Sequence, residues 1–346
     1  MVILANKTLQ AIEDALNGDK CGQFRQNLAW LLPKMEDAYR GTEKPYRKHL
    51  GASGIGAECS REIQLKWRWT SVPTFEERML RLFNRGHLEE ARFLAMLLCV
   101  PGLQLWFETE DGGQYKWSDH AGHYGSALDG IALGVPDLEP NTPAYTEFKT
   151  AGSKSFAKIK KNGVRAEKWE HFVQMQQCMK YYKLPASLYM VVNKDNDELY
   201  AEIINYEPHY ADQYSRRAKE IIYTTDTLPR ISNNKTFYKC RFCDKKAICH
   251  GDVIPDINCR TCAHWSAETD GGFSCARSNT EVHSDESFNG CPEHVYDPTL
   301  IPALSYIGGN SEQNYAEYAT RDGELIKQGP AFMGSLEFKE RFTKDK

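Results

Sequence analysis

The chain has 346 residues, which is long enough for one large domain with a sizeable core and a smaller second one. Its 43 lysines and arginines are balanced by 47 aspartates and glutamates, for a formal net charge of −4. This balance excludes nucleic-acid binding through overall charge, so any such groove must be a local patch. The sequence has no apolar run of about 18 residues and no basic start with a cleavage site. We therefore expect a cytoplasmic protein that does not enter a membrane.

Helical patterns fill the first part of the chain. The pattern of residues 1–50 predicts helices that pack onto or cap the elements that follow. Residues 78–98 form a longer amphipathic pattern, in which His87 and Glu90 are three positions apart and share one face. Either side chain can offer a metal ligand from that face.

The next segment, residues 103–149, predicts strands separated by turns. Asp129 stands in GSALDGIAL (125–133), which we interpret as one strand, and Glu147 and Lys149 stand in YTEFKT (145–150). If these strands form a hairpin, the three side chains point to one face, because strand side chains alternate. Two carboxylates can hold Mg²⁺ or Mn²⁺, and the lysine can orient or deprotonate a water. The alternative is an exposed strand edge with a chance Glu-x-Lys pattern.

A helix pattern over residues 167–184 places Gln174 where it can approach the same metal or a phosphate. Two strands with alternating side chains and a further helix follow this helix. This order predicts an α/β fold with a mixed central sheet flanked by helices. The preceding segment, 155–169, is the most basic of the chain. We interpret it as a DNA-contacting patch, with a solvated helix face as the alternative. Its basic residues are Lys154, Lys158, Lys160, Lys161, Arg165 and Lys168.

Residues 50–250 resemble the PD-(D/E)XK nuclease superfamily, specifically the RecB-like exonucleases, which include the CRISPR-associated RecB-type family and many phage recombination exonucleases. The motif slots are filled by Gly86 with His87 and Glu90, then Asp129, then Glu147 and Lys149, then Gln174. One slot departs from the family pattern, because Cys178 stands four residues after Gln174, where the family has a tyrosine. Either Tyr181 or Tyr182 substitutes for that tyrosine, or this element of the pattern is relaxed. The resemblance implies a metal-dependent DNA exonuclease, encoded by a phage and working beside recombination or replication proteins.

Eleven cysteines in a chain with no export signal favour metal binding over disulfides. Cys240, Cys243 and Cys249 form C-x2-C-x5-C, one thiolate short of a four-cysteine site. In RecB-like exonucleases with a [4Fe–4S] cluster, one cysteine precedes the nuclease motifs and three follow them. The resemblance therefore implies that Cys59 is the fourth ligand of a structural cluster. Zinc on the same thiolates, or on the triplet with His250, is the alternative.

A second cysteine set follows, with the spacing C-x2-C-x12-C-x15-C. It resembles a zinc ribbon or a small treble clef, in which four thiolates hold one Zn²⁺. We expect an independent unit that exposes Arg260, His264, Trp265 and Arg277 to DNA, or that docks a partner. A histidine in place of one thiolate, or unliganded cysteines, are alternatives. The cysteines are Cys259, Cys262, Cys275 and Cys291, and the histidines are His264, His283 and His294.

The domain boundaries follow from these assignments. We expect an N-terminal helical segment (1–50), a nuclease domain closed by the cluster (51–252), a zinc-binding module (253–300), and a hairpin with a tail (301–346). The expected function is a DNA exonuclease in which Asp129 and Glu147 bind the metal and Lys149 positions the water. The competing function is a non-catalytic DNA-binding or redox-sensing protein that kept the fold and the cluster.

Overall fold

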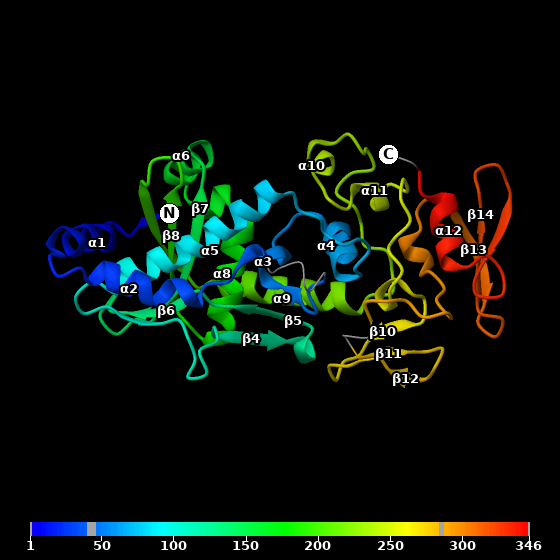
Figure 1. Cartoon of the computed structure of the whole chain (residues 1–346), viewed down its shortest axis with the longest axis horizontal. Helices are drawn as coiled ribbons and strands as arrows, with labels where there is room; N and C mark the ends of the chain where they lie inside the picture. The colour runs from blue at the N-terminus through cyan, green and yellow to red at the C-terminus, as the bar shows by residue number, and fades with distance from the viewer. Residues whose placement is uncertain (1, 40–45, 284–286, 345–346) are drawn as a thin grey trace.

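The computed structural model describes residues 2–39, 46–283 and 287–344. Its centre is a six-stranded sheet in the order β1-β9-β8-β7-β6-β3, in which β7 and β8 run parallel and all other neighbours are antiparallel (Figure 1). The mixed sheet agrees with the predicted fold class. Its strands are β1 (Ile3–Leu4), β3 (Gln104–Trp106), β6 (Gly130–Leu133), β7 (Ala144–Ala151), β8 (Ala186–Asn193) and β9 (Leu199–Asn205).

Strand β8 shows why helices must cover both faces of this sheet. All eight of its residues are buried, and the side chains of successive residues pack into different hydrophobic clusters. Tyr189 and Val191 belong to one hydrophobic cluster, whereas Leu188 and Met190 belong to the other. Since alternate side chains of a strand point to opposite faces, each face needs its own apolar cover.

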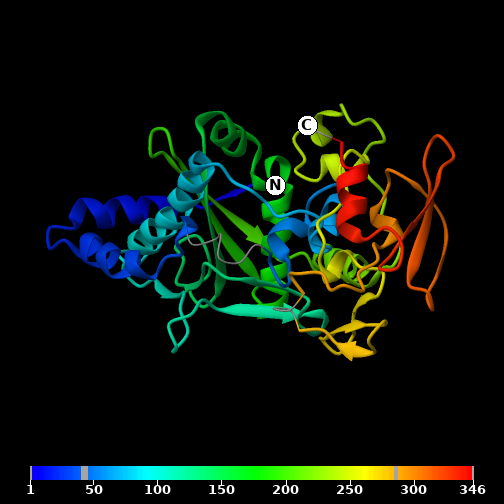
Figure 2. The same cartoon turned by 45° about the vertical axis from the view of Figure 1, so that its right-hand side comes forward.

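Helices supply that cover on both sides, so the prediction of a sheet flanked by helices is confirmed (Figures 1 and 2). Helices α1, α2 and α5 pack on one face, and α8 and α9 pack on the other together with α3, α4 and α6. The helix bounds are α1 (Asn6–Gly18), α2 (Gln23–Leu31), α3 (Ala52–Ile55), α4 (Ser60–Trp67), α5 (Glu77–Leu97), α6 (Ser153–Asn162), α7 (Val164–Glu167), α8 (Trp169–Tyr182) and α9 (Pro208–Tyr223), with 3-10 turns η1 (Leu32–Lys34) and η3 (His120–Gly122).

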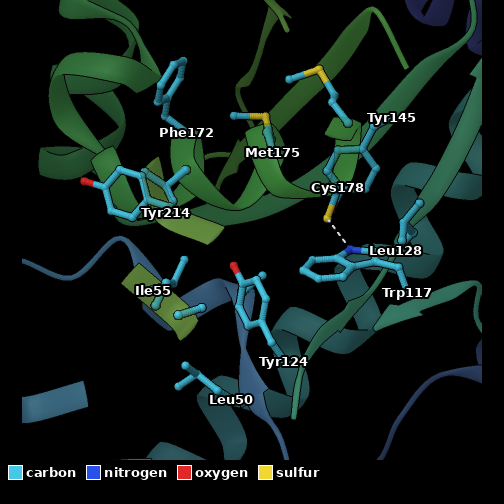
Figure 3. Packing of buried hydrophobic residues seen from close by; sticks show 14 of the residues in the cluster. Leu50, Ile55, Trp117, Tyr124, Leu128, Tyr145, Phe172, Met175, Cys178 and Tyr214 are labelled. Atoms are coloured by element: carbon cyan, nitrogen blue, oxygen red, sulfur yellow. Dashed lines mark hydrogen bonds between the residues drawn. The ribbon is translucent and has the colours of Figure 1, made fainter. Parts of the chain in front are cut away.

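The segment 125–133 is two strands, so our prediction of a single strand was wrong. Strand β5 (Tyr124–Ala127) belongs to a small sheet with β2 (Leu50–Gly51) and β4 (Lys116–Asp119), whereas β6 belongs to the central sheet. Leu128 is completely buried at the break and packs with Trp117 and Tyr145 in the core shown in Figure 3. The break places Asp129 directly before β6, at the edge of the strand pair that carries the other site residues.

The segment after α9 contains short helices and two small sheets. The hairpin predicted across Arg321–Gly323 is confirmed, since β14 and β15 pair antiparallel and Gly323 has a φ of +85°. The elements are α10 (Tyr238–Arg241), α11 (Lys246–Cys249), η4 (Cys259–Thr261), β10 (Trp265–Ala267), β11 (Phe273–Cys275), β12 (Thr280–Glu281), η5 (Pro298–Leu300), β13 (Ser305–Asn310), β14 (Tyr315–Ala319), β15 (Leu325–Gln328) and α12 (Ser335–Phe342).

Arg260 and Trp265 are buried, which corrects the expectation that they face solvent. The Arg260 guanidinium lies 4.1 Å from the ring centroid of Trp67 and 3.8 Å from that of Trp69. It donates to the carbonyl oxygens of Trp67 at 3.0 Å and Lys48 at 2.6 Å. Trp265 and Phe273 join the hydrophobic cluster that also contains α8 residues. Strands β10 and β11 therefore pack into the larger core, whereas Tyr296, Tyr318 and Phe338 belong to a separate hydrophobic cluster.

No helix in the described ranges is long and apolar enough to cross a membrane.

Candidate active site

Strand pairing brings Asp129 beside Glu147. Gly130 pairs with Thr146 in the antiparallel ladder of β6 and β7, so the residue before Gly130 lies across from the residue after Thr146. Asp129 Oδ2 accepts a hydrogen bond from the backbone N–H of Phe148 at 2.9 Å. A side chain on Gly130 would press against Thr146, because a Cβ there would lie 2.8 Å from Thr146 Oγ1. Glycine at this position therefore allows the close pairing that fixes Asp129.

Glu147 has no exposed surface, and both of its carboxylate oxygens have partners. Lys149 Nζ donates to Oε1, and the Tyr145 hydroxyl donates to Oε2. One face of β7 carries every second residue, and Tyr145, Glu147 and Lys149 share that face. Sequence reasoning missed Tyr145, although this period of two was a signal that could have identified it.

A cavity of about 340 Å³ opens in front of this strand. Glu90, Asp129 and Lys149 line it, and so does His87. Glu147 lies beside it through its contact with Lys149. The structure therefore gathers five of the six predicted catalytic residues at one place. The remaining residues that line the cavity are Gly86, Glu89, Phe93, Phe148, Thr150, Ala151, Ser155, Ile159, Lys168, His171, Tyr189 and Val191.

The carboxyl groups at this cavity are held close to one another in a poorly solvated place. Burial, followed by the charge of Asp129, raises the pKa of Glu90 to about 9. Burial, followed by the charge of Glu147, raises the pKa of Asp129 to about 7. Burial alone would lower the pKa of Lys149, but Glu147 and Asp129 outweigh it and raise this pKa. When all three carboxyl groups are ionised, the single ammonium leaves a net negative charge that a divalent cation can balance.

His87 lies at the cavity with its ring turned to another segment. Its Nδ1 lies 3.0 Å from the carbonyl oxygen of Glu36. This leaves Nε2 as the ring nitrogen that can take a ligand. Nε2 is itself 3.9 Å from the Glu36 carboxylate.

Gln174 is not among the described residues that line the cavity, although it is nearly buried on α8. The two candidate substitutes for the family tyrosine bind elsewhere: the Tyr181 hydroxyl donates to Asp119, and the Tyr182 hydroxyl donates to the Lys116 carbonyl. Cys178 is buried and accepts a hydrogen bond from Trp117 Nε1 at 3.5 Å (Figure 3). The tyrosine slot of the family pattern is thus filled by a buried thiol.

His171 and Lys168 reach the cavity from the start of α8. His171 Nδ1 lies 3.1 Å from the Tyr189 hydroxyl. Burial, followed by the charges of Lys149 and Lys168, lowers the pKa of His171 to about 3, so the ring is neutral. Our sequence analysis did not identify His171 as a site residue. It stands three positions before Gln174, on the same helix face, and that spacing was the available signal.

The four cysteines of the first set line a second cavity, of about 230 Å³. Cys59 begins α4, and Cys240, Cys243 and Cys249 come from α10, α11 and the turn between them. A Cβ on Gly56 would lie 2.8 Å from the Cα of Glu170, so glycine lets α3 approach the start of α8. Glu170 lines the cysteine cavity, and its neighbour His171 lines the carboxylate cavity. The first turn of α8 therefore separates the two cavities.

Potential ligands and unpaired donor atoms lie beside these thiols. Within the described residues, Glu62, Cys243 and Asp244 form a group of three potential metal ligands gathered within 4.8 Å. Two buried nitrogen atoms at this place, Arg61 Nε and His250 Nε2, have no hydrogen-bond partner in the described chain. Donors of this kind suit an anionic thiolate-bound cluster.

The second cysteine set lies around η4 and β11. Burial, followed by the charges of Cys291 and Cys275, raises the pKa of Cys262 to about 11, so these three thiols are neighbours. His294 is buried, with Nδ1 2.8 Å from Ser335 Oγ and Nε2 3.3 Å from Thr261 Oγ1. His264 Nε2 lies 2.7 Å from Asn314 Oδ1. His264 and His294 thus already have polar partners, and the four-cysteine ligand set stays a prediction.

No protein-family model matches the chain, and no curated protein matches it. Among solved structures, LHK-Exo in complex with dAMP has 16% sequence identity and a TM-score of 0.37, over 54% of this chain and 88% of that one. The structure of SSO0001 has 14% identity and a TM-score of 0.38, over 66% and 94%. An alkaline exonuclease (LHK-Exo) from Laribacter hongkongensis has 17% identity and a TM-score of 0.34, over 50% and 86%. These identities and TM-scores are low, so the functional interpretation depends on the geometry of the site.

Proposed function

We propose that the chain is a metal-dependent exonuclease that hydrolyses the phosphodiester bonds of DNA. One observation carries the proposal: Glu90, Asp129 and Lys149 line a single cavity, and Lys149 contacts the buried Glu147. Carboxylates with a lysine in a cavity open to solvent suit water activation at a phosphodiester. Phage origin and a role beside recombination or replication proteins are part of the proposal through the family resemblance.

In this mechanism, Asp129 and Glu147 would hold Mg²⁺ or Mn²⁺, and Glu90 or His87 would add a ligand. Such a cation would lower the pKa of a water and polarise the phosphoryl oxygens. Lys149 Nζ orients the attacking water and balances the charge that develops on the phosphate. Glu147 holds Lys149 in place, and the Tyr145 hydroxyl holds Glu147. The neutral His171, which lines the cavity from α8, orients the water or a phosphate oxygen.

The first cysteine set is proposed to hold a [4Fe–4S] cluster through Cys59, Cys240, Cys243 and Cys249. Support comes from the shared cavity and from the partnerless nitrogens of Arg61 and His250 beside it. Cys59 and Cys240 are 181 positions apart, so the cluster closes a long loop and constrains the unfolded chain as a cross-link does. His250 also lines the cavity, which keeps zinc on the triplet and His250 as the alternative.

The second cysteine set is proposed to hold one structural Zn²⁺ through Cys259, Cys262, Cys275 and Cys291. The proximity of Cys262 to Cys275 and Cys291 supports it. Binding one ion would join η4 to β11 and to the segment before Cys291.

A non-catalytic DNA-binding or redox-sensing protein is the competing function. The joint presence of three carboxylates and a lysine at one cavity favours the exonuclease, because neither DNA binding nor redox sensing requires that set.

The experiment is incubation of purified protein with end-labelled linear DNA and with covalently closed circular DNA, each with Mn²⁺, with Mg²⁺ and with a chelator. We expect loss of the linear substrate from its ends, no change in the circle, and no cleavage in chelator. Comparable degradation of the circle would indicate an endonuclease. Binding without cleavage of either substrate would support the non-catalytic function.

A further inference from the structure

Two phenylalanine rings stand exposed beside a groove near the cysteine cavity. Phe242 is 84% exposed and Phe75 is 50% exposed. Both line a groove of about 570 Å³ that runs between α4 and the loop carrying Cys240 and Cys243. Tyr238, on the same loop, is 63% exposed. Exposed rings that gather at a groove are typical of a binding surface, because each costs free energy in water.

Cationic side chains accompany these rings. The Arg241 guanidinium lies 5.9 Å from the Phe242 ring centroid, and Lys239 Nζ lies 5.8 Å from that of Tyr238. Arg47 is exposed in the same groove. The groove also contains Glu62, which contacts Lys66 at 2.5 Å, and Asp244, which contacts both Lys66 and Lys245 at 3.5 Å. Local ion pairing thus offsets these two acidic groups, and Arg47 and Arg241 remain to meet an anionic partner.

A ring contact joins the groove to α5, whose later turns line the carboxylate cavity. Phe75 packs edge-to-face on Phe83, with 5.0 Å between ring centroids. Phe83 lies one helical turn before His87, which lines the carboxylate cavity. The same half of α5 exposes a row of arginines toward solvent, spaced three and four residues apart. These are Arg78, Arg81 and Arg85.

We propose that this surface, defined by Phe75, Phe242 and Tyr238 with Arg78, Arg81 and Arg241, binds single-stranded DNA and leads it to the carboxylate cavity. Aromatic rings stack on unpaired bases, while arginines contact the phosphates. A duplex does not fit this chemistry, since its bases are stacked on each other and cannot reach the rings. The inference rests on the proposed function for the direction of the path, but the binding itself can be measured without cleavage.

The test is fluorescence anisotropy of labelled oligo(dT) and of a blunt duplex of the same length, in a chelator so that no cleavage occurs. Phe242→Ala and Phe75→Ala are compared with Tyr306→Ala, which removes a ring that is 54% exposed on β13. Each of the two groove variants should bind oligo(dT) about fivefold or more weakly, which is the effect of losing one base–ring stack. Duplex affinity should change less than about twofold, and Tyr306→Ala should bind as wild type does.

Two further measurements guard against indirect effects, since Phe242 stands next to Cys243. The metal content of Phe242→Ala should equal that of the wild type, and Phe242→Trp should retain oligo(dT) binding because it retains a ring. Wild-type oligo(dT) affinity in both alanine variants would overturn the proposal and leave a protein partner as the occupant of the groove. Equal losses for oligo(dT) and duplex would also overturn it. Absence of nuclease activity, with these affinities as expected, would contradict only the proposed function.

Discussion

The carboxylate of Asp129 accepts a hydrogen bond from the backbone N–H of Phe148 at 2.9 Å. This bond joins the segment between β5 and β6 to β7, the strand that carries Glu147 and Lys149. An asparagine at position 129 can accept the same hydrogen bond through its amide oxygen. It would lack the negative charge that a metal needs. Asp129→Asn is therefore a variant that separates the fold of the site from its chemistry.

Replacing Lys149 should affect both rate and stability. Lys149→Met removes the group that orients the water, so we expect the cleavage rate to fall by about 10² or more. It also leaves Glu147 buried without its cation, which destabilises a protein by about 3–5 kcal/mol in comparable cases. Thermal unfolding and single-turnover cleavage measure the two effects. The double variant Lys149→Met with Glu147→Gln should recover stability without activity, and recovery of activity would contradict the assigned roles.

The metal-free protein should become less stable as the pH rises. The pKa of Asp129 rises from 3.8 to about 7, and that of Glu90 rises from 4.5 to about 9, chiefly through burial. Both groups therefore keep protons in the folded chain at pH values where the unfolded chain has lost them. The free energy of unfolding should fall between about pH 4 and pH 9, since stability rises with pH only where the unfolded state binds more protons.

The measurement for this prediction is the melting temperature in chelator across that pH range. Mn²⁺ should bind more tightly at high pH, because it no longer competes with protons. The variant with Asp129→Asn and Glu90→Gln should show a flatter dependence. A wild-type curve parallel to that of the variant would contradict the assignment of protons to these two groups.

Anaerobically purified protein should be brown and contain about four irons per chain. Cys59→Ala should remove the colour, because Cys59 lines the same cavity as the other three thiols. Cys21→Ala is the matched control, since Cys21 is exposed and lies outside that cavity. Colourless protein with zinc as its only thiolate-bound metal would favour the zinc alternative.

Zinc should be lost separately from iron. Cys262→Ser should remove one equivalent of zinc per chain, because a structural zinc with three thiolates binds far more weakly. Iron content should not change, since Cys262 belongs to neither the cysteine cavity nor α10 and α11. Simultaneous loss of both metals, measured by elemental analysis, would contradict a division into two sites.

The local part of the site was predictable from the sequence. Glu147 and Lys149 alternate on one strand, and the period of two fixes their common face. Glu90 was placed correctly at the cavity because the 3.6-residue period of α5 sets which side chains share a face. These predictions depend on neighbours in sequence, for which backbone geometry alone is sufficient.

Long-range packing was not predictable in the same way. From the sequence, Arg260 is expected to lie at the surface, because a charged residue is rarely buried without a carboxylate partner. Its burial follows from Trp67 and Trp69, about 190 positions earlier, whose rings replace water around the guanidinium. Leu128 likewise belongs to a core assembled from several distant segments, and its burial accompanies the division of 125–133 into two strands.

The measurement that tests the central claim most directly is the release of label from end-labelled linear DNA in Mn²⁺ by the wild type and by Asp129→Asn. We predict rapid release by the wild type and none by the variant, with equal melting temperatures in chelator at a pH below 5, where the carboxyl of Asp129 is protonated and uncharged like the amide. DNA affinity in chelator should be the same for both proteins. Release by Asp129→Asn at the wild-type rate would contradict the assignment of this cavity as the active site.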